Sequence, residues 1–321
     1  KAKKLIKLAK EGGAHAAKFQ TYKAHKIVKK NSKAYWDLKK EKTKSQFELF
    51  SKLDKFKDKD YRELALYCKK IKIDFLSTPF DLEAVDTLNP LVPVFKVSSS
   101  DINNVPLLEK VASKKKPVLL STGASTLEEI KFAINILKKG TNKITIMHCI
   151  LSYPSCDSDA NLNMIKDLKR VFPNYVIGYS DHTLPDSQMV NLTTSFLLGA
   201  KVIEKHFTNN KNLKGNDHYH AMDLKDLQIV SQNLKRVVLI QGKSNKKQVL
   251  KCEKKSRKFA RRSIVVQKEI KKNKIITPKD IIALRPSDGI SVKHWHKIIG
   301  KKAKKNLKVN RSILWSDLKQ K

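Results

Sequence analysis

Short runs of β-branched and apolar residues alternate with longer amphipathic stretches along the first three quarters of the chain. This alternation is typical of βαβ units arranged around a parallel sheet. The runs predict seven strands, at residues 16–22, 73–77, 94–98, 117–121, 144–150, 175–180 and 201–206. Apolar residues at helical spacing predict helices over 3–10, 127–138, 162–171, 186–198 and 224–238, the second of them followed by a stop signal at Gly140.

Two α/β architectures accommodate these parallel strands. A (β/α)8 TIM barrel needs one more strand, and because the chain opens directly on the helical pattern at 3–10, that first strand would precede Lys1. A doubly wound open sheet needs no further strand. It usually carries a glycine-rich phosphate loop after its first strand, however, and no such loop follows residues 16–22. We therefore expect the TIM barrel, with its first strand missing from this sequence.

The composition changes after Val238, where the lysine-rich stretch 242–258 is typical of a linker. Short runs at 263–267, 275–276, 281–284 and 312–315 then predict strands of a small β-rich module. We expect a barrel domain over 1–241, a linker over 242–258 and the small module over 259–321. Within the barrel, the long polar stretch 23–60 predicts an elaborated loop of the kind that builds active sites.

The charge balance of 68 basic against 30 acidic residues, a net +38, suggests binding to nucleic acid or to another anionic surface. Only eight of the basic residues are arginine, and the lysines are scattered along the whole chain. Because recognition of phosphate and bases favours arginine and exposed aromatic rings, we expect a solvated lysine surface and keep nucleic-acid binding as an alternative.

The cysteines and the apolar runs bear on the cellular compartment. The four cysteines include no CxxC pair, which indicates reduced thiols. No apolar run approaches the roughly 20 residues that span a bilayer, and no signal-like segment opens the chain. We expect a cytoplasmic protein with no membrane partner.

Polar side chains occur at the ends of nearly all the predicted strands, where the catalytic groups of a barrel lie. They are Lys18, Gln20, Thr78, Lys96, Ser99, Asp101, Ser121, His148, Ser180, His182, Glu204 and His206. Lysines with hydroxyls suit a phosphate or carboxylate, and two or three of the histidines could bind a divalent metal at ~2.1 Å. Each residue alone also has a structural explanation: a strand-end serine is often a helix N-cap, and Thr126 before Glu129 has the pattern of a capping box.

The ordered set of motifs resembles the sialic acid synthase family, which condenses phosphoenolpyruvate with a sugar to make N-acetylneuraminate and the related legionaminic and pseudaminic acids. The resemblance rests on AKFQTYKA (17–24), STPF (77–80), FKVSSSDINNVPLL (95–108), LSTG (120–123), HC (148–149), GYSDHT (178–183), EKHF (204–207) and GNDH (215–218). FARRS (259–263) and LRP (284–286) resemble the antifreeze-like SAF domain that ends these synthases.

The resemblance implies roles for individual residues. Phosphoenolpyruvate-binding positions are matched by Lys18, Thr78, Lys96, Ser99, Ser121 and Ser180, and metal ligands by His182 and His206. Positions on the sugar side are matched by Gln20, Tyr153 and Asp217. In the family the small domain reaches over the partner's barrel in a domain-swapped homodimer, so Arg285 would meet the acetamido group, unless it is simply a surface residue beside Pro286.

The implied reaction joins phosphoenolpyruvate to a 2-acetamido sugar aldehyde, such as N-acetylmannosamine or a 6-deoxy diacetamido relative, and yields a nonulosonic acid and phosphate. Lys18, Lys96 and Asp101 are the expected catalytic residues, with Asp101 as general base where most relatives carry glutamate. The expected cofactor is a divalent metal, Mn²⁺ first, with Mg²⁺ or Co²⁺ as alternatives.

Two departures from the family pattern concern the site. Leu151 stands where several relatives place a polar residue, and the family's first strand, with its acidic residue and Asn-His pair, would precede Lys1. Two alternative functions follow, namely a truncated and catalytically inactive synthase-like protein that binds anions, or a lysine-rich nucleic-acid-binding protein.

Overall fold

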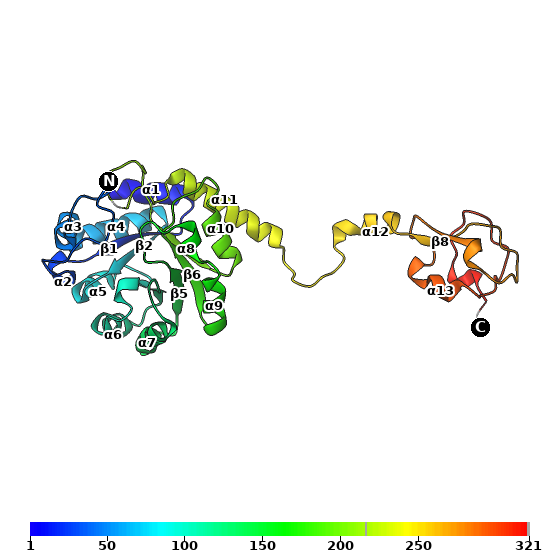
Figure 1. The fold of residues 1–321 in the computed structure, drawn as a ribbon, viewed down its shortest axis with the longest axis horizontal. Coiled ribbons are helices and arrows are strands. Elements are labelled where there is room, and N and C mark those ends of the chain that lie inside the picture. Colours follow the sequence, from blue (N-terminus) through cyan, green and yellow to red (C-terminus); the bar gives the residue numbers. More distant parts are fainter. Residues whose placement is uncertain (216, 320–321) are drawn as a thin grey trace. The chain divides into compact units, whose positions relative to one another are not determined.

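Seven parallel strands form the framework of the N-terminal part of the computed structural model, which describes residues 1–215 and 217–319 (Figure 1). The strands are β1 Ala16–Thr21, β2 Asp74–Pro79, β3 Phe95–Val97, β4 Val118–Ser121, β5 Ile144–Cys149, β6 Val176–Asp181 and β7 Val202–Lys205. All of the predicted strands of this part are confirmed, with ends that differ from the predicted ones by at most two residues. The chain divides into two units, Lys1–Gln241 and Gly242–Lys321.

The strands follow one another in sequence order around a curled sheet. Strands β1 and β2 form one parallel ladder, β3 to β7 form a second, and β2 lies beside β3. Lys18 on β1 and Glu204 on β7 nevertheless come within 3.4 Å, whereas a flat sheet of this width would hold its outer strands roughly 29 Å apart. The strand order never reverses, so the doubly wound alternative is wrong. The structure shows a curled parallel α/β sheet, and closure into an eight-stranded barrel stays a prediction.

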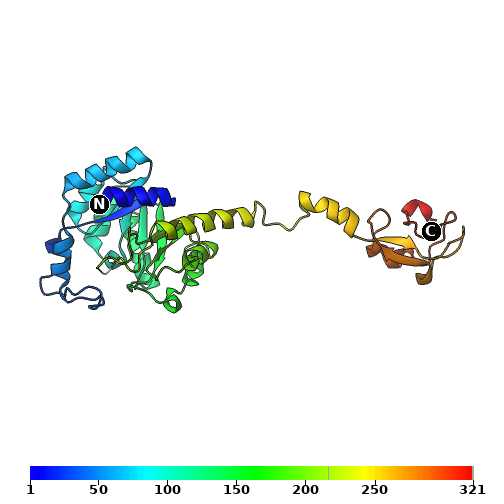
Figure 2. The same ribbon diagram turned by 90° about the horizontal axis from the view of Figure 1, so that it is seen from above.

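Helices pack against the outer face of this sheet, and α1 lies between α4 and α11 (Figures 1 and 2). The helices of the unit are α1 Ala2–Gly12, α2 Ala24–Ile27, α3 Gln46–Leu53, α4 Asp58–Ile71, α5 Leu82–Leu88, α6 Val105–Ser113, α7 Leu127–Leu137, α8 Asp157–Ala160, α9 Met164–Val171, α10 Val190–Leu197 and α11 Leu224–Gln241, with the 3-10 turn η1 Ser99–Asp101. Within the described residues, no helix combines the length and apolar character that crossing a bilayer requires.

Local sequence signals explain where several helices begin and end. Thr126 caps α7 and forms the expected capping box with Glu129. Helix α1 ends at Gly13, whose φ of 96° lies in the left-handed region that glycine adopts without strain. Gly140, the predicted stop after α7, lies where an added Cβ would come within 1.8 Å of the Ala112 carbonyl oxygen, so no larger residue fits there.

Along the strands, side chains point alternately to the outer face of the sheet, which packs against the helices, and to its inner face. Leu120, Ile146 and Ile177 pair in register across β4, β5 and β6, and all three are buried against the helices. Their neighbours in sequence point to the opposite face, because successive side chains of a strand alternate. The outer face therefore holds the hydrophobic core, and the inner face is left for polar residues.

The segments predicted as a loop and as a linker both contain helices. The predicted loop 23–60 contains α2 and α3 and the first turn of α4. The predicted linker 242–258 is partly helical, because η2 Lys251–Glu253 and α12 Lys254–Ala260 occupy its second half and α12 runs past its predicted end. The lysine-rich composition indicated an exposed segment, but it did not reveal this helix.

The second unit is a small β-rich unit with its own core. Strands β8 Ser263–Val266 and β9 Ile281–Leu284 are antiparallel, and the short helical turns are η3 Pro278–Asp280, η4 Val292–His294, α13 Trp295–Ile298 and η5 Trp315–Asp317. The predicted strands at 275–276 and 312–315 are wrong, since only single bridges form at Ile275 and Ser312. Ile276 and Ile313 are fully buried, so the apolar pattern there reflects side-chain packing and not a strand ladder.

A buried ion pair on the outer face joins the ends of β6 and β7. Lys205 donates to the Asp181 carboxylate and to the Thr183 carbonyl oxygen at 2.7 Å, and both charged side chains are 1% exposed. The Tyr179 hydroxyl donates to Asp181 at 2.7 Å, and the Thr183 hydroxyl does so at 2.8 Å. The pair and its hydrogen bonds hold together the two strand ends that carry His182 and His206.

We expect Asp181→Asn to destabilise the first unit by about 3–5 kcal/mol, because the Lys205 ammonium would stay buried without its carboxylate. Urea unfolding followed by circular dichroism measures the change. Glu48→Gln is the control, since its pair with Lys52 is more than half exposed and contributes about 0.5 kcal/mol or less. Equal unfolding midpoints for the two variants would contradict the expectation.

Candidate active site

The inner face of the curled sheet gathers most of the predicted donor-binding residues. Register pairs Gln20 with Thr78 across β1 and β2, and Cys149 with Ser180 and Ser180 with Glu204 across β5, β6 and β7. Residues paired in this way, and those two positions along, share one face. The inner face thus holds Lys18, Gln20, Thr78, Lys96, Ser121, Cys149, Ser180 and Glu204.

Glu204 lies at the centre of the charges on this face. Its Oε1 is 3.4 Å from the Lys18 Nζ and 3.7 Å from the Lys96 Nζ, and it accepts a hydrogen bond from the Ser180 hydroxyl at 3.3 Å. Lys96 also donates to the Ser121 hydroxyl at 2.7 Å. Two ammonium groups therefore converge on one carboxylate inside the curled sheet.

The electrostatics of this cluster follow from burial and charge. Desolvation opposes ionisation of Glu204, but the nearby Lys18 and Lys96 lower its pKa to about 2. Desolvation lowers the pKa of Lys96, even though Glu204 works in the opposite direction. The strand-end position of Glu204 was visible in the sequence, but its contacts with Lys18 and Lys96 were not, because these partners come from distant strands.

The remaining hydroxyl and thiol groups lie around the same site. Ser99, the first residue of η1, accepts a hydrogen bond from the Gly123 amide at 2.9 Å. Cys149 lies with its Sγ 3.8 Å from the His182 Nδ1, and burial raises the pKa of its thiol. Thr78 is buried on β2. These contacts place the ends of β4, β5 and β6 and the start of η1 around one polar region, and Thr78 shares the inner face through its register with Gln20.

Beyond the strand ends, imidazole rings gather around Tyr153. The ring centroids of His182 and His206 are 5.4 Å apart, and those of His206 and His220 are 4.9 Å apart. The Tyr153 ring lies 4.2 Å from His182 and about equally far from the other two, at 6.1 and 6.0 Å. The residues directly after β6 and β7, with two from the segment further along, thus form a histidine cluster, which we define as His182, His206, His220 and the adjacent Asp217.

Several ligand atoms in the histidine cluster suit a divalent metal. The His182 Nδ1 is 2.7 Å from the Ile150 carbonyl oxygen, which can only accept, so Nδ1 carries the proton and Nε2 keeps its lone pair for an ion. His206, Asp217 and His220 each offer a ligand atom, and these atoms lie within 4.8 Å of one another. Imidazole and carboxylate are ligands that Mn²⁺, Co²⁺ and Zn²⁺ accept. The residues therefore fit a metal site.

Burial shifts the pKa values of the cluster. Desolvation lowers the pKa of His182 and of His206, although the hydrogen bond to Ile150 partly offsets this for His182 and the charge of Asp217 does so for His206. Desolvation opposes ionisation of Asp217, but His220 and His206 lower its pKa overall. Neutral rings beside an ionised carboxylate are the protonation states that metal ligation requires.

His148 does not join the histidine cluster. Its Nε2 is 2.8 Å from the Ala160 carbonyl oxygen, and its ring stacks on Tyr179 at 5.6 Å. His148 pairs in register with Tyr179, one position away from the inner-face residues Cys149 and Ser180, so it points to the outer face. His148 is a packed structural residue.

Two predicted site residues, Asp101 and Arg285, have surroundings of their own to describe. Among residues 1–215 and 217–319, the hydrogen bonds of the Asp101 carboxylate come from Asn104 at 2.9 Å and Ser100 at 3.4 Å, and none comes from the inner-face residues. Burial raises the pKa of Asp101. Arg285 is an exposed residue of the second unit, directly after β9. The roles of both residues stay predictions.

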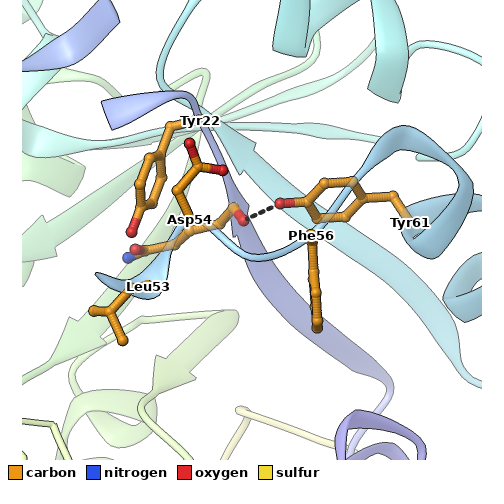
Figure 3. Close-up of a pocket in the computed structure, with 6 residues that line it drawn as sticks. Tyr22, Leu53, Asp54, Phe56 and Tyr61 are labelled. Atoms are coloured by element: carbon orange, nitrogen blue, oxygen red, sulfur yellow. Dashed lines mark hydrogen bonds between the residues drawn. The ribbon is translucent and has the colours of Figure 1, made fainter. Parts of the chain in front are cut away.

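A cavity of about 240 Å³ lies next to the end of β1 (Figure 3). The residues around it are Gln20 on β1, Tyr22 directly after β1, Leu53 at the end of α3, Asp54 and Phe56 between α3 and α4, and Tyr61 on α4. The Tyr61 hydroxyl donates to the Gln20 carbonyl oxygen at 3.0 Å, and burial raises the pKa of Tyr22 to about 12. The predicted loop 23–60 thus supplies a carboxylate and one of the three aromatic rings of this cavity, beside the predicted sugar-side residue Gln20.

Comparisons with known proteins agree with the sequence motifs. The NeuB family model matches residues 5–246, and the SAF domain model matches residues 261–319. The chain is 39% identical over 319 residues to the N,N'-diacetyllegionaminic acid synthase of Campylobacter jejuni, covering 97% of this chain and 93% of that protein. It is 33% identical over 329 residues to the pseudaminic acid synthase of Helicobacter pylori, covering 99% of this chain and 93% of that protein.

A solved structure shares the fold. The N-acetylneuraminic acid synthetase of Leptospira borgpetersenii, determined in complex with citrate, has a TM-score of 0.69 and 31% sequence identity. The alignment covers 79% of this chain and 84% of that one.

We expect Glu204→Gln to bind inorganic phosphate roughly tenfold more tightly than the wild type, because its carboxylate competes for Lys18 and Lys96 and repels an anion. Lys96→Met should weaken the same binding. Isothermal titration calorimetry with phosphate measures both changes. Glu63→Gln is the control, since Glu63 pairs with Lys3 at the surface. Phosphate binding that is unchanged or weaker in Glu204→Gln would show that the lysines do not form an anion site.

Proposed function

The chain belongs to the NeuB family and carries a SAF domain, and on this premise we propose that it is a nonulosonic acid synthase that condenses phosphoenolpyruvate with an acetamido sugar. The observation that carries the proposal is the convergence of Lys18 and Lys96 on one carboxylate, in the unit that also contains the histidine cluster. An anionic donor and a polarised acceptor need these two kinds of group close together.

Phosphoenolpyruvate carries a carboxylate and a phosphate, and the inner face offers groups for both. Lys18 and Lys96 would supply positive charge, while Thr78, Ser99, Ser121 and Ser180 would supply short hydroxyl donors. The support for this assignment is that the two lysines already hold a carboxylate, that of Glu204, at 3.4 and 3.7 Å. Binding here would convert a bimolecular encounter into a positioned one.

On the acceptor side, we assign Gln20, Tyr153 and Asp217 to the sugar. The cavity beside Gln20 supports an assignment of the sugar's distal carbons to the segment 23–60 (Figure 3). His182 and His206 would hold the divalent metal, Mn²⁺ first with Mg²⁺ or Co²⁺ as alternatives, and the bound ion supplies Lewis-acid polarisation of the aldehyde oxygen. Arg285 would contact the acetamido group across a domain-swapped homodimer.

In the proposed reaction, C3 of phosphoenolpyruvate forms a bond with the aldehyde carbon, and the aldehyde oxygen takes up a proton to become a hydroxyl. Water adds to C2, and Asp101 accepts its proton as general base. The tetrahedral adduct collapses with cleavage of the bond between C2 and the phosphate oxygen, which leaves a 2-keto acid and inorganic phosphate. Lys18 and Lys96 compensate the negative charge of the departing phosphate.

Three further expectations from the sequence complete the proposal. The curled sheet would belong to an eight-stranded barrel, the protein would work in the cytoplasm, and it would act as a homodimer. The alternatives make different predictions: a catalytically inactive anion-binding protein would bind phosphoenolpyruvate without turnover, and a nucleic-acid-binding protein would show affinity that falls steeply with salt.

We expect the purified chain to release phosphate and keto acid in equal amounts from phosphoenolpyruvate, Mn²⁺ and at least one member of a panel of 2-acetamido sugars. Chelation by EDTA and the substitution His206→Ala should each abolish this release, while circular dichroism of the variant stays unchanged. His25→Ala, at an exposed position on α2, is the control. If His206→Ala released phosphate at the wild-type rate, the proposed role of the metal would be wrong. If the chain bound phosphoenolpyruvate but released no phosphate with any sugar, the catalytically inactive alternative would be favoured.

We expect Asp101→Asn to lower kcat by about 10²–10⁴-fold and to remove the acidic limb of the pH–rate profile. A general base acts only as the carboxylate, so turnover of the wild type should fall as the pH drops through the pKa of Asp101, which burial raises. Asp74→Asn, at an exposed position at the start of β2, is the control. An unchanged pH profile in Asp101→Asn would assign the base to another group.

A further inference from the structure

His220 is a buried imidazole that lacks the hydrogen bonds such a group normally makes. Its side chain is fully buried, and neither Nδ1 nor Nε2 has a hydrogen-bond partner anywhere in residues 1–215 or 217–319. Leaving a buried polar group unsatisfied destabilises the folded protein, and most buried side-chain polar atoms in native proteins have a partner. The ring nitrogens of His220 therefore point to a ligand from outside the described residues.

The neighbours of His220 identify the class of that ligand. The Asp217 Oδ1 is 3.6 Å from the His220 Nε2, and the Asp217 Oδ2 is 3.8 Å from the His206 Nδ1. Both separations are too long for hydrogen bonds. Two atoms that bind one ion at ~2.1 Å lie at most ~4.2 Å apart, so both separations suit ligands placed around a single cation.

We propose that His220 is a third imidazole ligand of the divalent ion, so that His206, Asp217 and His220 surround the ion together with His182. This rests on the proposed function and deepens it, because it concerns the same metal. It adds two ligands to the histidine pair of the proposed reaction, and it moves Asp217 from the sugar to the ion. The ligand atoms of His206, Asp217 and His220 lie within 4.8 Å of one another, so side-chain shifts of less than about 1 Å bring all three to bonding distance. His182 lies outside this compact group, with its ring centroid 5.4 Å from that of His206, and would complete the shell from that side.

A further consequence concerns which metal the site prefers. Mg²⁺ prefers oxygen ligands and an octahedral shell with retained water, whereas imidazole suits Mn²⁺, Co²⁺ and Zn²⁺. Each added imidazole shifts the site away from Mg²⁺. The structure thus predicts that Co²⁺ and Mn²⁺ bind more tightly than Mg²⁺, and that the difference shrinks when His220 is replaced.

The competing explanation is that His220 only fills space between aromatic rings. Its ring centroid lies 6.0 Å from that of Tyr153 and 5.3 Å from that of Tyr219. Phenylalanine can make the same packing contacts but has no nitrogen to offer a metal. The substitution His220→Phe therefore separates packing from ligation, and His220→Ala removes both.

The experiment is a Co²⁺ titration of the full chain, followed by calorimetry and by the visible absorption of the bound ion. We expect His220→Phe and His220→Ala to bind Co²⁺ at least about tenfold more weakly than the wild type and to show an altered absorption band. The matched control is His218→Ala, from the same segment, because the His218 Nδ1 is already 2.8 Å from the Thr208 hydroxyl. Thermal unfolding shows whether each variant is folded.

A measurement on the wild type keeps the test independent of the variants. Electron spin echo envelope modulation of Mn²⁺ bound to the wild type should detect three coordinated imidazole nitrogens. The inference would be overturned if only two nitrogens were detected and His220→Phe bound Co²⁺ as tightly as the wild type. It would also be overturned if the wild type bound neither Mn²⁺ nor Co²⁺. Synthase turnover alongside that result would leave the proposed function standing, whereas three nitrogens without turnover would support the ligand and refute the function.

Discussion

The charge cluster of Lys18, Lys96 and Glu204 is the interaction on which the rest of the first unit depends. These side chains come from β1, β3 and β7, and they can meet only because the sheet curls. Charged groups inside a protein are tolerated when they are paired and hydrogen-bonded, which the contacts to Ser121 and Ser180 complete. The same pairing keeps two lysine ammonium groups inside the sheet, where an anionic ligand could replace the Glu204 carboxylate as their partner. The residues that stabilise the curled sheet are therefore also those of the proposed anion site.

The two-residue period of a strand separates chemical groups from supporting groups at the ends of β6 and β7. His182 and His206 continue the inner face, while Asp181 and Lys205, one position before each of them, form a buried pair on the outer face. A single residue of register shift would exchange the two sets. The outer pair therefore fixes the position of the inner histidines, and the short distance between their rings follows from the strand pairing and needs no flexible loop.

The proposed donor and acceptor sides are built from different kinds of structure. The groups proposed to bind the anionic donor stand largely on strands, where backbone pairing fixes their positions. The cavity beside Gln20 is walled largely by the segment between β1 and α4, and Asp217 and His220 follow β7. Segments between elements tolerate change in sequence and length better than a sheet does.

Within the first unit, the sequence by itself determined the strands, the family and most inner-face residues, because period-two patterning and short motifs are local signals. Local signals also predicted the capping box at Thr126 correctly, and they failed at 275–276 and 312–315, where apolar residues pack without a ladder. Only the tertiary structure decided that Glu204 stands between two lysines, that His148 faces outward and that His220 approaches His206. These facts depend on which face each strand presents and on contacts between segments far apart along the chain, and a linear pattern carries no information about such distances.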